Sequence, residues 1–308
     1  MFIQQVKKGA ALALAAAMAF GLSACSTSTP KEETIEPVSI LCPTGAPALS
    51  IQGAADLEDV SIEYVDGSDL LTSELAKEDG EYDIIVAPTN VGAKVYSESK
   101  SYNLDAVLTW GNLYLVGPEG TDLKTASIAA FGQNAVPGLV FNQVEEEGLN
   151  VTWYSSAAEA QQALLTDQQQ VALLAQPVAQ ATIAKAKENG KELSVLQDLQ
   201  SLWQEKTGSE DAGYPQASLF VKSGEEDKVS RVLEGIETFI ADADEDTLTS
   251  AIDNAGAENL GVPNTQIAVK TWKQQNIRYV KGADAKEDIE NFLKVFNIEL
   301  PKGLIVEE

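Results

Sequence analysis

The segment Asp83–Tyr96 reads DIIVAPTNVGAKVY, and it contains the strand–turn–helix unit that decides the fold. Residues 84–87 are apolar, which is typical of a buried strand in a parallel sheet. The turn Pro88–Asn90 follows, and Asn90 is a favoured N-cap for a helix that we expect to begin at the next residue. Similar units recur along the chain, so the sequence predicts an α/β protein with a mainly parallel sheet and helices on both faces.

Strand-like and helix-like stretches alternate on both sides of this unit. The predicted strands are Val38–Cys42, Ser61–Val65, Ala106–Leu108, Asn112–Val116, Ile128–Ala130, Val151–Tyr154, Val171–Ala175, Ser194–Leu196, Ala217–Val221 and Ile277–Val280. The predicted helices between them include Leu70–Lys77, Pro137–Glu147, Ala157–Leu165, Pro177–Lys187 and Leu199–Lys206. Breaks at Gly117–Gly120 and Thr207–Pro215 interrupt the alternation and indicate two lobes.

The composition excludes several classes of function. The 308 residues include 21 Lys and Arg against 47 Asp and Glu, a formal net charge of −26, which is the opposite of a nucleic-acid-binding footprint. The chain has no histidine, so the common general base and imidazole metal ligands are missing. Its two cysteines, Cys25 and Cys42, cannot form a disulfide framework. We therefore predict no catalytic residue, no metal site and no cofactor.

The N-terminus has the pattern of an export signal. Lys7 and Lys8 precede an apolar run, GAALALAAAMAFG, which is too short to span a membrane and suits a signal peptide. The run leads into Leu22–Cys25, which resembles a bacterial lipobox, so cleavage before Cys25 and lipidation of its sulfur are expected. Residues 25–37 are polar and read as a flexible tether after a signal peptide of residues 1–24. This predicts a protein anchored by lipid at the outer face of a bacterial cell membrane.

The turns that follow the predicted strands are the candidate ligand site. In an open α/β sheet, ligands bind beside the carboxyl ends of the strands. Turns rich in Gly, Pro, Asn, Gln or Thr follow four of the predicted strands, at Thr44–Ala46, Pro88–Asn90, Gly132–Asn134 and Gln176–Pro177. Such residues are also ordinary in turns, but their recurrence in both halves of the chain favours a shared cleft.

These segments resemble extracytoplasmic solute-binding proteins of ABC importers, in particular the nitrate/taurine/sulfonate and thiamine-pyrimidine binding-protein group. The resemblance rests on LCPTGAPA at 41–48, the opening segment at 83–96, FGQNAVPGLVFNQV at 131–144, AQPVAQATI at 175–183 and the tail at 276–296. One departure is Gln176, because many relatives carry an acidic residue before this proline.

The resemblance implies a two-lobe, type II periplasmic-binding-protein-like fold with a discontinuous first lobe. Lobe 1 is expected at 38–116 and 217–308 and lobe 2 at 117–216, with crossings near Tyr114–Gly117 and Tyr214–Ser218. The implied function is capture of a small molecule between the lobes and its delivery to ABC permease subunits, by a protein that is not an enzyme and is a monomer. The expected ligand-binding residues are Thr44, Gly45, Ala46, Thr89, Asn90, Trp110, Asn112, Tyr114, Gly132, Gln133, Asn134, Gln176 and Tyr214.

The class of ligand stays open at this point. Helix N-termini after the turns would suit a sulfonate or carboxylate, but the chain has only two arginines, Arg231 and Arg278, to clamp an anion. Aromatic residues near the crossings, such as Trp110, Tyr114 and Tyr214, favour a neutral or heteroaromatic metabolite. The alternatives are a sulfonate, taurine or nitrate binder, and a lipoprotein adhesin or chaperone that takes no part in transport. An enzymatic, pyrimidine-synthesising relative is disfavoured because that chemistry depends on histidine.

Overall fold

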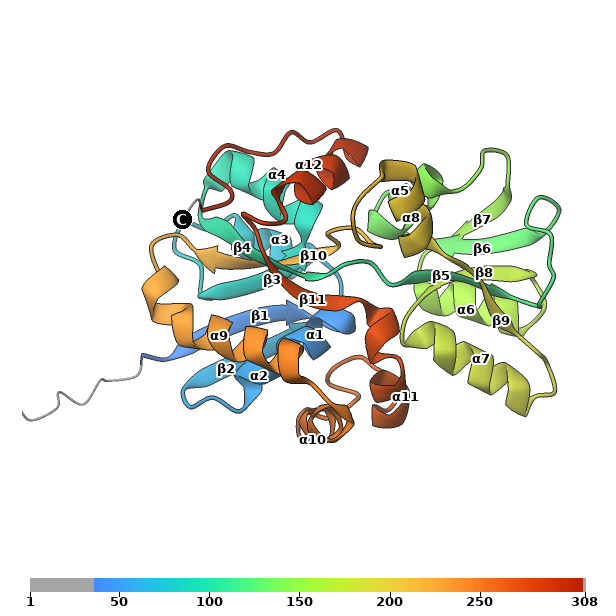
Figure 1. The fold of residues 1–308 in the computed structure, drawn as a ribbon, viewed down its shortest axis with the longest axis horizontal. Coiled ribbons are helices and arrows are strands. Elements are labelled where there is room, and N and C mark those ends of the chain that lie inside the picture. The colour runs from blue at the N-terminus through green and yellow to red at the C-terminus, as the bar shows by residue number, and fades with distance from the viewer. Residues whose placement is uncertain (1–35, 307–308) are drawn as a thin grey trace, which may run out of the picture. The chain divides into compact units, whose positions relative to one another are not determined.

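The computed structural model describes residues 36–306, and these contain two β-sheets (Figure 1). The predicted signal peptide, Cys25 and nearly all of the predicted tether lie outside the described residues. The first sheet consists, in spatial order, of β11 (Ile277–Lys281), β4 (Tyr102–Thr109), β10 (Ala217–Lys222), β3 (Ile84–Pro88), β1 (Val38–Pro43) and β2 (Val60–Val65). The second consists of β7 (Asn150–Tyr154), β6 (Ser127–Phe131), β8 (Val171–Ala175), β5 (Leu113–Gly117) and β9 (Ser194–Asp198).

Helices cover both faces of the first sheet, and each covered face has its own hydrophobic core. On one face lie α1 (Ala46–Ser50), α2 (Gln52–Ala55), α9 (Glu226–Asp242), α10 (Glu245–Ala255) and α11 (Thr265–Lys270), with the short 3₁₀ helix Trp272–Gln275 following α11. On the other lie α3 (Asp69–Leu75), α4 (Thr89–Ser99) and α12 (Lys286–Val295) (Figure 1).

The second sheet also separates two cores. The helices around it are α5 (Val136–Val144), α6 (Ala157–Leu165), α7 (Val178–Glu188) and α8 (Leu199–Thr207). Central strands such as β8 are apolar at nearly every position because both of their faces are buried. Phe292 of α12 belongs to the core of the second sheet, whereas Ile289 and Leu293 of the same helix belong to the core of the first. The α/β fold class expected from the sequence is confirmed.

Strand direction corrects one expectation, because both sheets are mixed and not mainly parallel. In the first sheet β10 runs antiparallel to β3 and β4, and in the second β5 runs antiparallel to β8 and β9. These are the strands by which the chain enters each sheet after leaving the other. A buried central strand is apolar whichever way it runs, so the hydrophobic pattern does not reveal its direction.

The crossing between the sheets lies earlier than expected. Residues 113–117 pair with β8 and β9, so they belong to the second sheet, whereas the expected lobe 1 extends to residue 116. The chain leaves the first sheet after Thr109 and returns to it at Ala217. The Gly–Pro break at 117–118 ends β5 and does not mark the crossing. The turn that the sequence indicates therefore lies at the C-terminal end of β5, whereas the crossing lies before its N-terminal end.

The helix after β3 also begins differently from the expectation. It starts at Thr89 with Pro88 in the N-cap position, and no side chain caps it. Asn90 is the second residue of α4 and is not its N-cap. Proline fits this position because its fixed φ suits the entry to a helix. Within residues 36–306 no helix combines the length and the hydropathy needed to cross a bilayer.

Candidate ligand site at the crossing of the two sheets

A cavity of about 430 Å³ lies where the turns of the two sheets meet. It is bordered by Pro43 at the end of β1, Pro88 at the end of β3 and Ala175 at the end of β8. Ala217 borders it from the start of the antiparallel strand β10. The remaining lining residues are Thr44, Gly45, Ala46, Pro47, Gly67, Ser68, Leu71, Asn112, Ala135, Val136, Pro137, Gln176, Pro177, Val178, Gln216 and Gly261. The volume is in the range of small-molecule sites in proteins.

Backbone conformation at Gly45 brings the first turn to the cavity. Gly45 has φ of 93°, in the left-handed region where a side chain would be strained, and its N–H donates to the carbonyl oxygen of Leu260 at 2.8 Å. The hydroxyl of Thr44 donates to Asp66 Oδ1 at 2.7 Å. These contacts tie the turn after β1 to the segments before α11 and after β2, so its position is fixed.

Asn112 and Gln176 join the two strands of the second sheet that face the cavity. The N–H of Gln176 donates to the carbonyl of Asn112 at 3.0 Å, and Asn112 Nδ2 donates to the carbonyl of Gln176 at 3.1 Å. Gln176 Oε1 accepts from the N–H of Gln180 at 3.1 Å. Asn112 is only 3% exposed, and its Oδ1 has no hydrogen-bond partner among the described residues.

Gln216 offers a second unpaired acceptor from the return crossing. Its N–H donates to the carbonyl of Thr109 at 2.9 Å, and its carbonyl accepts from the N–H of Thr89 at 3.1 Å. The backbone of Gln216 is therefore fixed, while its side-chain Oε1 is buried without a partner among the described residues. A buried amide oxygen without a partner is costly, and two such oxygens belong to residues that line this cavity.

Among the described residues, the lining contains no charged and no aromatic side chain. Its apolar surface comes from aliphatic residues and from five prolines, namely Pro43, Pro47, Pro88, Pro137 and Pro177. The polar surface comes from hydroxyl, amide and backbone groups. Elsewhere in the described residues no set of three or more His, Cys, Asp or Glu side chains is arranged to hold a metal ion.

Five of the thirteen expected ligand-binding residues line this cavity: Thr44, Gly45, Ala46, Asn112 and Gln176. Thr89 and Asn90 lie beside it, where the fully buried hydroxyl of Thr89 lies 2.7 Å from the hydroxyl of Ser218. Gly132, Gln133 and Asn134 form the turn after β6, but the residues that reach the cavity from this turn are 135–137.

The expected aromatic wall is not there. Tyr214 is fully buried between Trp203 and Phe292, with ring centroids 5.3 and 5.8 Å away. The ring of Trp110 carries the guanidinium of Arg278 at 4.6 Å, and Tyr114 donates to the carbonyl of Gln274 at 2.7 Å. Burial raises the pKa of both tyrosines above the usual value. These rings stabilise the crossing by packing, which is the usual role of a large aromatic residue beside a core.

Several lining residues lie outside the site expected from the sequence. Gln216 and Ala217 belong to the expected crossing, and Gly67, Ser68 and Leu71 lie after the edge strand β2. Gly67 and Ser68 occupy a turn that follows a strand, which is the same signal that marks the other turns of the site. Gly261 had no such signal, because it reaches the cavity only through the fold of a long C-terminal segment.

Comparisons with solved structures agree on the fold. A structure described as an ABC transporter from Parabacteroides distasonis matches with a TM-score of 0.74 and 18% identity, over 88% of this chain and 99% of the other. The periplasmic aliphatic sulphonate binding protein SsuA of Escherichia coli matches with a TM-score of 0.61 and 10% identity, over 89% and 95%. The alkanesulfonate-binding protein SsuA of Xanthomonas axonopodis pv. citri, bound to MOPS, matches with a TM-score of 0.54 and 14% identity, over 87% and 96%.

No protein-family model matches the sequence, and no curated protein sequence matches it significantly. At identities as low as those of the solved structures, the likeness shows the fold and does not extend to a solute. The chain has the type II periplasmic-binding-protein-like fold, which confirms the fold expected from the sequence.

Proposed function

We propose that this protein is the solute-binding component of an ABC importer, and that its solute is a small neutral molecule held in the cavity between the two sheets. The observation that carries the proposal is a cavity of about 430 Å³ at the chain crossings, lined by residues from both sheets and by no charged side chain. Its fold is shared by ABC-transporter binding proteins, some of which are named for sulfonates.

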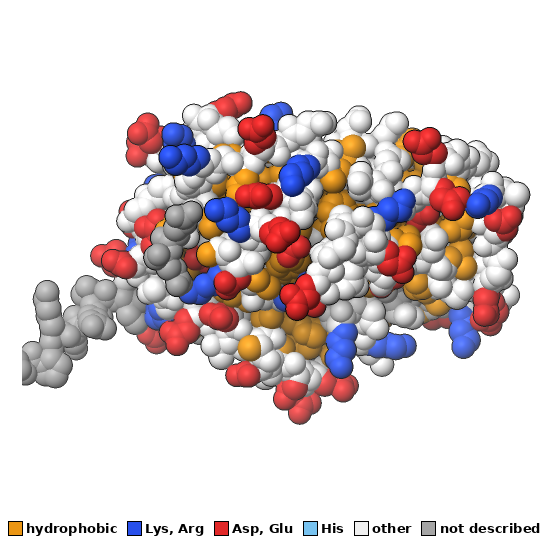
Figure 2. All heavy atoms as spheres, turned by 45° about the horizontal axis from the view of Figure 1, so that its top comes forward, with side chains coloured by type: hydrophobic (Ala, Val, Ile, Leu, Met, Phe, Trp, Pro, Cys, Tyr) orange, Lys and Arg blue, Asp and Glu red, His pale blue; other side chains and the backbone are white. Residues whose placement is uncertain are grey.

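The electrostatics of the site favour a neutral solute over an anion. Bidentate arginine is the usual clamp for sulfonate or carboxylate. Arg231 of α9 donates to the carbonyl of Glu58, and Arg278 pairs with Asp211 over the ring of Trp110. Neither arginine lines the cavity. The chain also carries a net charge of −26, and Figure 2 shows carboxylates spread over the visible face. Such a surface repels anions during approach.

The helix starts beside the cavity are also poorly suited to an anion. A helix N-terminus binds anions through its free N–H groups. Pro47 is the second residue of α1 and Pro137 the second residue of α5, so each of these helices lacks one of the N–H groups that would face the ligand. The lining therefore supports the expectation of a neutral solute. It does not support the expectation that the solute stacks against aromatic rings.

The unpaired acceptors define what the solute must supply. Asn112 Oδ1 and Gln216 Oε1 both lack partners within residues 36–306, so we propose that the solute donates at least two hydrogen bonds, one to each. Aliphatic and proline surfaces enclose its apolar part. A compact amide or a nitrogen heterocycle with N–H groups has this chemistry.

Anchoring, partners and lobe limits complete the proposal. A lipidated Cys25 would hold the protein at the outer face of the cell membrane as a monomer, and ABC permease subunits would receive the solute. From strand membership we propose lobe 1 at 38–109 and 217–308, and lobe 2 at 113–207, with the two segments between them acting as the hinge.

A thermal-shift screen tests the class of solute directly. Neutral pyrimidines and amides are compared with an alkanesulfonate and nitrate, and a ligand at 100 times its Kd stabilises the fold by about 2.7 kcal/mol. Stabilisation by neutral donors is the expected result. Stabilisation by the anions alone would support a sulfonate or nitrate binder instead, and the absence of any saturable ligand would favour an adhesin or chaperone.

A variant then locates the solute that the screen finds. Gln216→Met keeps the side-chain length and the backbone bonds but removes the acceptor, so the affinity should fall about tenfold, the loss of about one hydrogen bond. Gln162→Met, at an exposed position of α6, is the matched control and should leave the affinity unchanged. Equal affinities in all three proteins would place the solute outside this cavity.

A further inference from the structure

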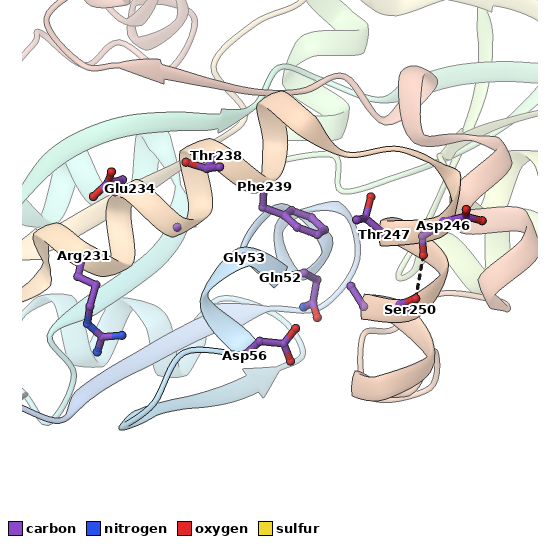
Figure 3. Close-up of a pocket in the computed structure, with 12 residues that line it drawn as sticks. Gln52, Gly53, Asp56, Arg231, Glu234, Thr238, Phe239, Asp246, Thr247 and Ser250 are labelled. Atoms are coloured by element: carbon purple, nitrogen blue, oxygen red, sulfur yellow. Dashed lines mark hydrogen bonds between the residues drawn. The ribbon is translucent and has the colours of Figure 1, made fainter.

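A second and larger hollow, of about 640 Å³, lies among α2, α9 and α10, which cover one face of the first sheet (Figure 3). Three helices and the residue after α2 form it, and its lining residues are Gln52 and Gly53 from α2, Asp56 directly after α2, Arg231, Glu234, Gly235, Thr238 and Phe239 from α9, and Asp246, Thr247, Ser250 and Ala251 from α10. None of these residues lines the cavity at the crossing, so the two sites are separate.

The walls of the hollow are held in place by close backbone packing and by a cap. A Cβ on Gly53 would lie 2.2 Å from the carbonyl oxygen of Gly235, so α2 and α9 touch through their backbones. The start of α10 is fixed by a capping box, in which Asp244 accepts from the N–H of Thr247 at 2.8 Å. The backbones that carry the lining side chains are therefore held by packing and capping.

Gln52 places an unpaired acceptor in this wall. Its side-chain Nε2 donates to the carbonyl of Ala48 at 2.7 Å and to the hydroxyl of Tyr64 at 2.9 Å. The residue is only 3% exposed, and its Oε1 has no partner among the described residues. Figure 3 shows this amide between the ring of Phe239 and the carboxylate of Asp56. A buried acceptor in this position calls for a donor from outside the chain.

The charges around Gln52 are mainly negative. Asp56, Glu234 and Asp246 line the hollow, and its only basic lining residue is Arg231, which donates to the carbonyl of Glu58 at 3.0 Å. Figure 3 shows Arg231 at the far end of α9, away from Gln52. The hydroxyl of Ser250 donates to the carbonyl of Asp246 at 2.9 Å, which leaves the lone pairs of its oxygen directed outward as an acceptor.

We propose that this hollow binds a primary ammonium group, with Gln52 Oε1 and the carboxylate of Asp56 as its main acceptors. An ammonium is a compact cation with three donors, which suits a single amide oxygen beside a carboxylate better than a planar guanidinium does. The half-buried ring of Phe239 packs against the methylene stem that carries the ammonium, as rings do beside lysine stems. The group is supplied either by a free alkylamine or by the lysine side chain of a partner.

The test titrates n-butylammonium chloride into the full chain at low salt and follows the methylene resonances of the probe by NMR. We expect saturable binding with upfield shifts from the ring of Phe239, and no binding of n-butanol, which has the same stem without the charge. Asp56→Asn and Asp246→Asn should each weaken binding several-fold, and raised salt should do the same.

Glu237→Gln is the matched control, because Glu237 is an exposed acid of α9 that does not line the hollow. The affinity of the Glu237→Gln protein for n-butylammonium should equal that of the wild type. Non-saturable shifts, or equal losses in the control and in Asp56→Asn, would overturn the proposal, since they would mean general attraction to an acidic surface. Gln52→Met, with its fold checked by thermal unfolding, should also weaken binding, and an unchanged affinity would remove Gln52 from the site.

A second pair of probes identifies the source of the ammonium. Nα-acetyl-lysine amide carries the same charged stem on a peptide backbone, and Nα-acetyl-norleucine amide is its uncharged match. Binding of the lysine probe at least as tight as that of n-butylammonium supports a lysine of a partner, and clearly weaker binding supports a free amine. Binding of the norleucine probe with equal affinity would contradict a role for the charge.

Discussion

At the residue scale, Asp83 is held by an ion pair and by hydrogen bonds at the start of β3. It forms an ion pair with Lys228 at 2.7 Å and accepts from the N–H of Ser39 at 2.9 Å. Burial by itself raises the pKa of Asp83, but the hydrogen bonds from Lys228 and Ser39 outweigh it, and the net pKa is lowered. Asp83 therefore joins the start of β3 to β1 and to α9.

Asp83→Asn should reduce the free energy of unfolding by about 2 kcal/mol at pH 7, because it leaves a partly buried lysine without its partner. The lowered pKa means that the carboxylate stabilises the fold above its unfolded value of 3.8, and that this contribution is lost as the pH falls through the folded value. Urea unfolding at pH 7 and at pH 3 checks both points. Asp79→Asn, at an exposed position, is the control, and a deficit that did not shrink at pH 3 would rule out the charge as its cause.

Glu145, directly after α5, behaves in the opposite way. Burial, and next to it the charge of Glu146, raise the pKa of Glu145 to about 7, while Lys206 lowers it. The fold thus favours the protonated form, and this contribution is present below the unfolded value of 4.5 and lost as the pH rises through about 7.

Glu145→Gln, which stays neutral at every pH, should match the wild type near pH 4 and melt at a higher temperature than the wild type at pH 8. Thermal unfolding between pH 4 and pH 8 measures the difference in melting temperature between the two proteins. Glu147→Gln, at an exposed position, provides the comparison. A difference in melting temperature that stayed constant with pH would show that Glu145 ionises normally in the folded protein.

At the scale of single elements, α4 packs directly on the central strand β10. A Cβ on Gly92 would lie 2.0 Å from Phe220, whose ring is fully buried. The helix can approach the sheet this closely only because this position has no side chain. The same helix begins at Thr89 beside the cavity, so its packing also sets the position of Pro88 and Asn90.

Gly92→Ala should destabilise the protein by about 2 kcal/mol, although alanine favours a helix over glycine by about 1 kcal/mol. The clash with Phe220 outweighs this preference because the ring cannot move out of a close-packed core. Lys94→Ala, on the exposed face of α4, is the control and should be neutral or slightly stabilising. Denaturant unfolding compares the two variants, and a stabilised Gly92→Ala protein would mean that α4 can shift away from the sheet.

At the scale of the whole described chain, Asn276 ties both crossings to β11. Its Nδ2 donates to the carbonyl of Trp110 at 2.7 Å and to that of Ala212 at 3.2 Å, and its own carbonyl accepts from the N–H of Trp110 at 2.9 Å. Arg278 adds an ion pair with Asp211 at 2.6 Å. One short segment thus makes hydrogen bonds to both the outgoing and the returning crossing.

Asn276→Gly should make the amides of residues 110–112 and 213–216 exchange with solvent about tenfold faster, because opening then breaks fewer hydrogen bonds. Glycine retains the left-handed conformation of Asn276, which has φ of 51°, so the amide side chain is the only group removed. Asn297→Gly is the matched control, since Asn297 has φ of 55° outside the crossings. Equal exchange in both variants would show that Asn276 does not hold the crossing. Hydrogen-exchange mass spectrometry measures the effect.

Local sequence determined the strand and helix units and part of the site. The helix Ala157–Leu165 and the strand Val171–Ala175 lie at their predicted residues because apolar periodicity and turn residues act within a few positions of one another. The turn at Thr44–Ala46, together with Gln176, reaches the cavity for the same reason, since the residue that ends a parallel strand is placed at the edge of the sheet.

Tertiary structure alone decided strand direction, the place of the crossing and the character of the cavity walls. The apolar pattern of β5 is the same in either direction, so only its pairing with β8 and β9 assigns it to the second sheet. Tyr214 and Trp110 have side chains that suit a ligand wall equally well, but Phe292 and Arg278, far away in sequence, cover their rings. Burial depends on which distant residues pack against a side chain, and no local pattern contains that information.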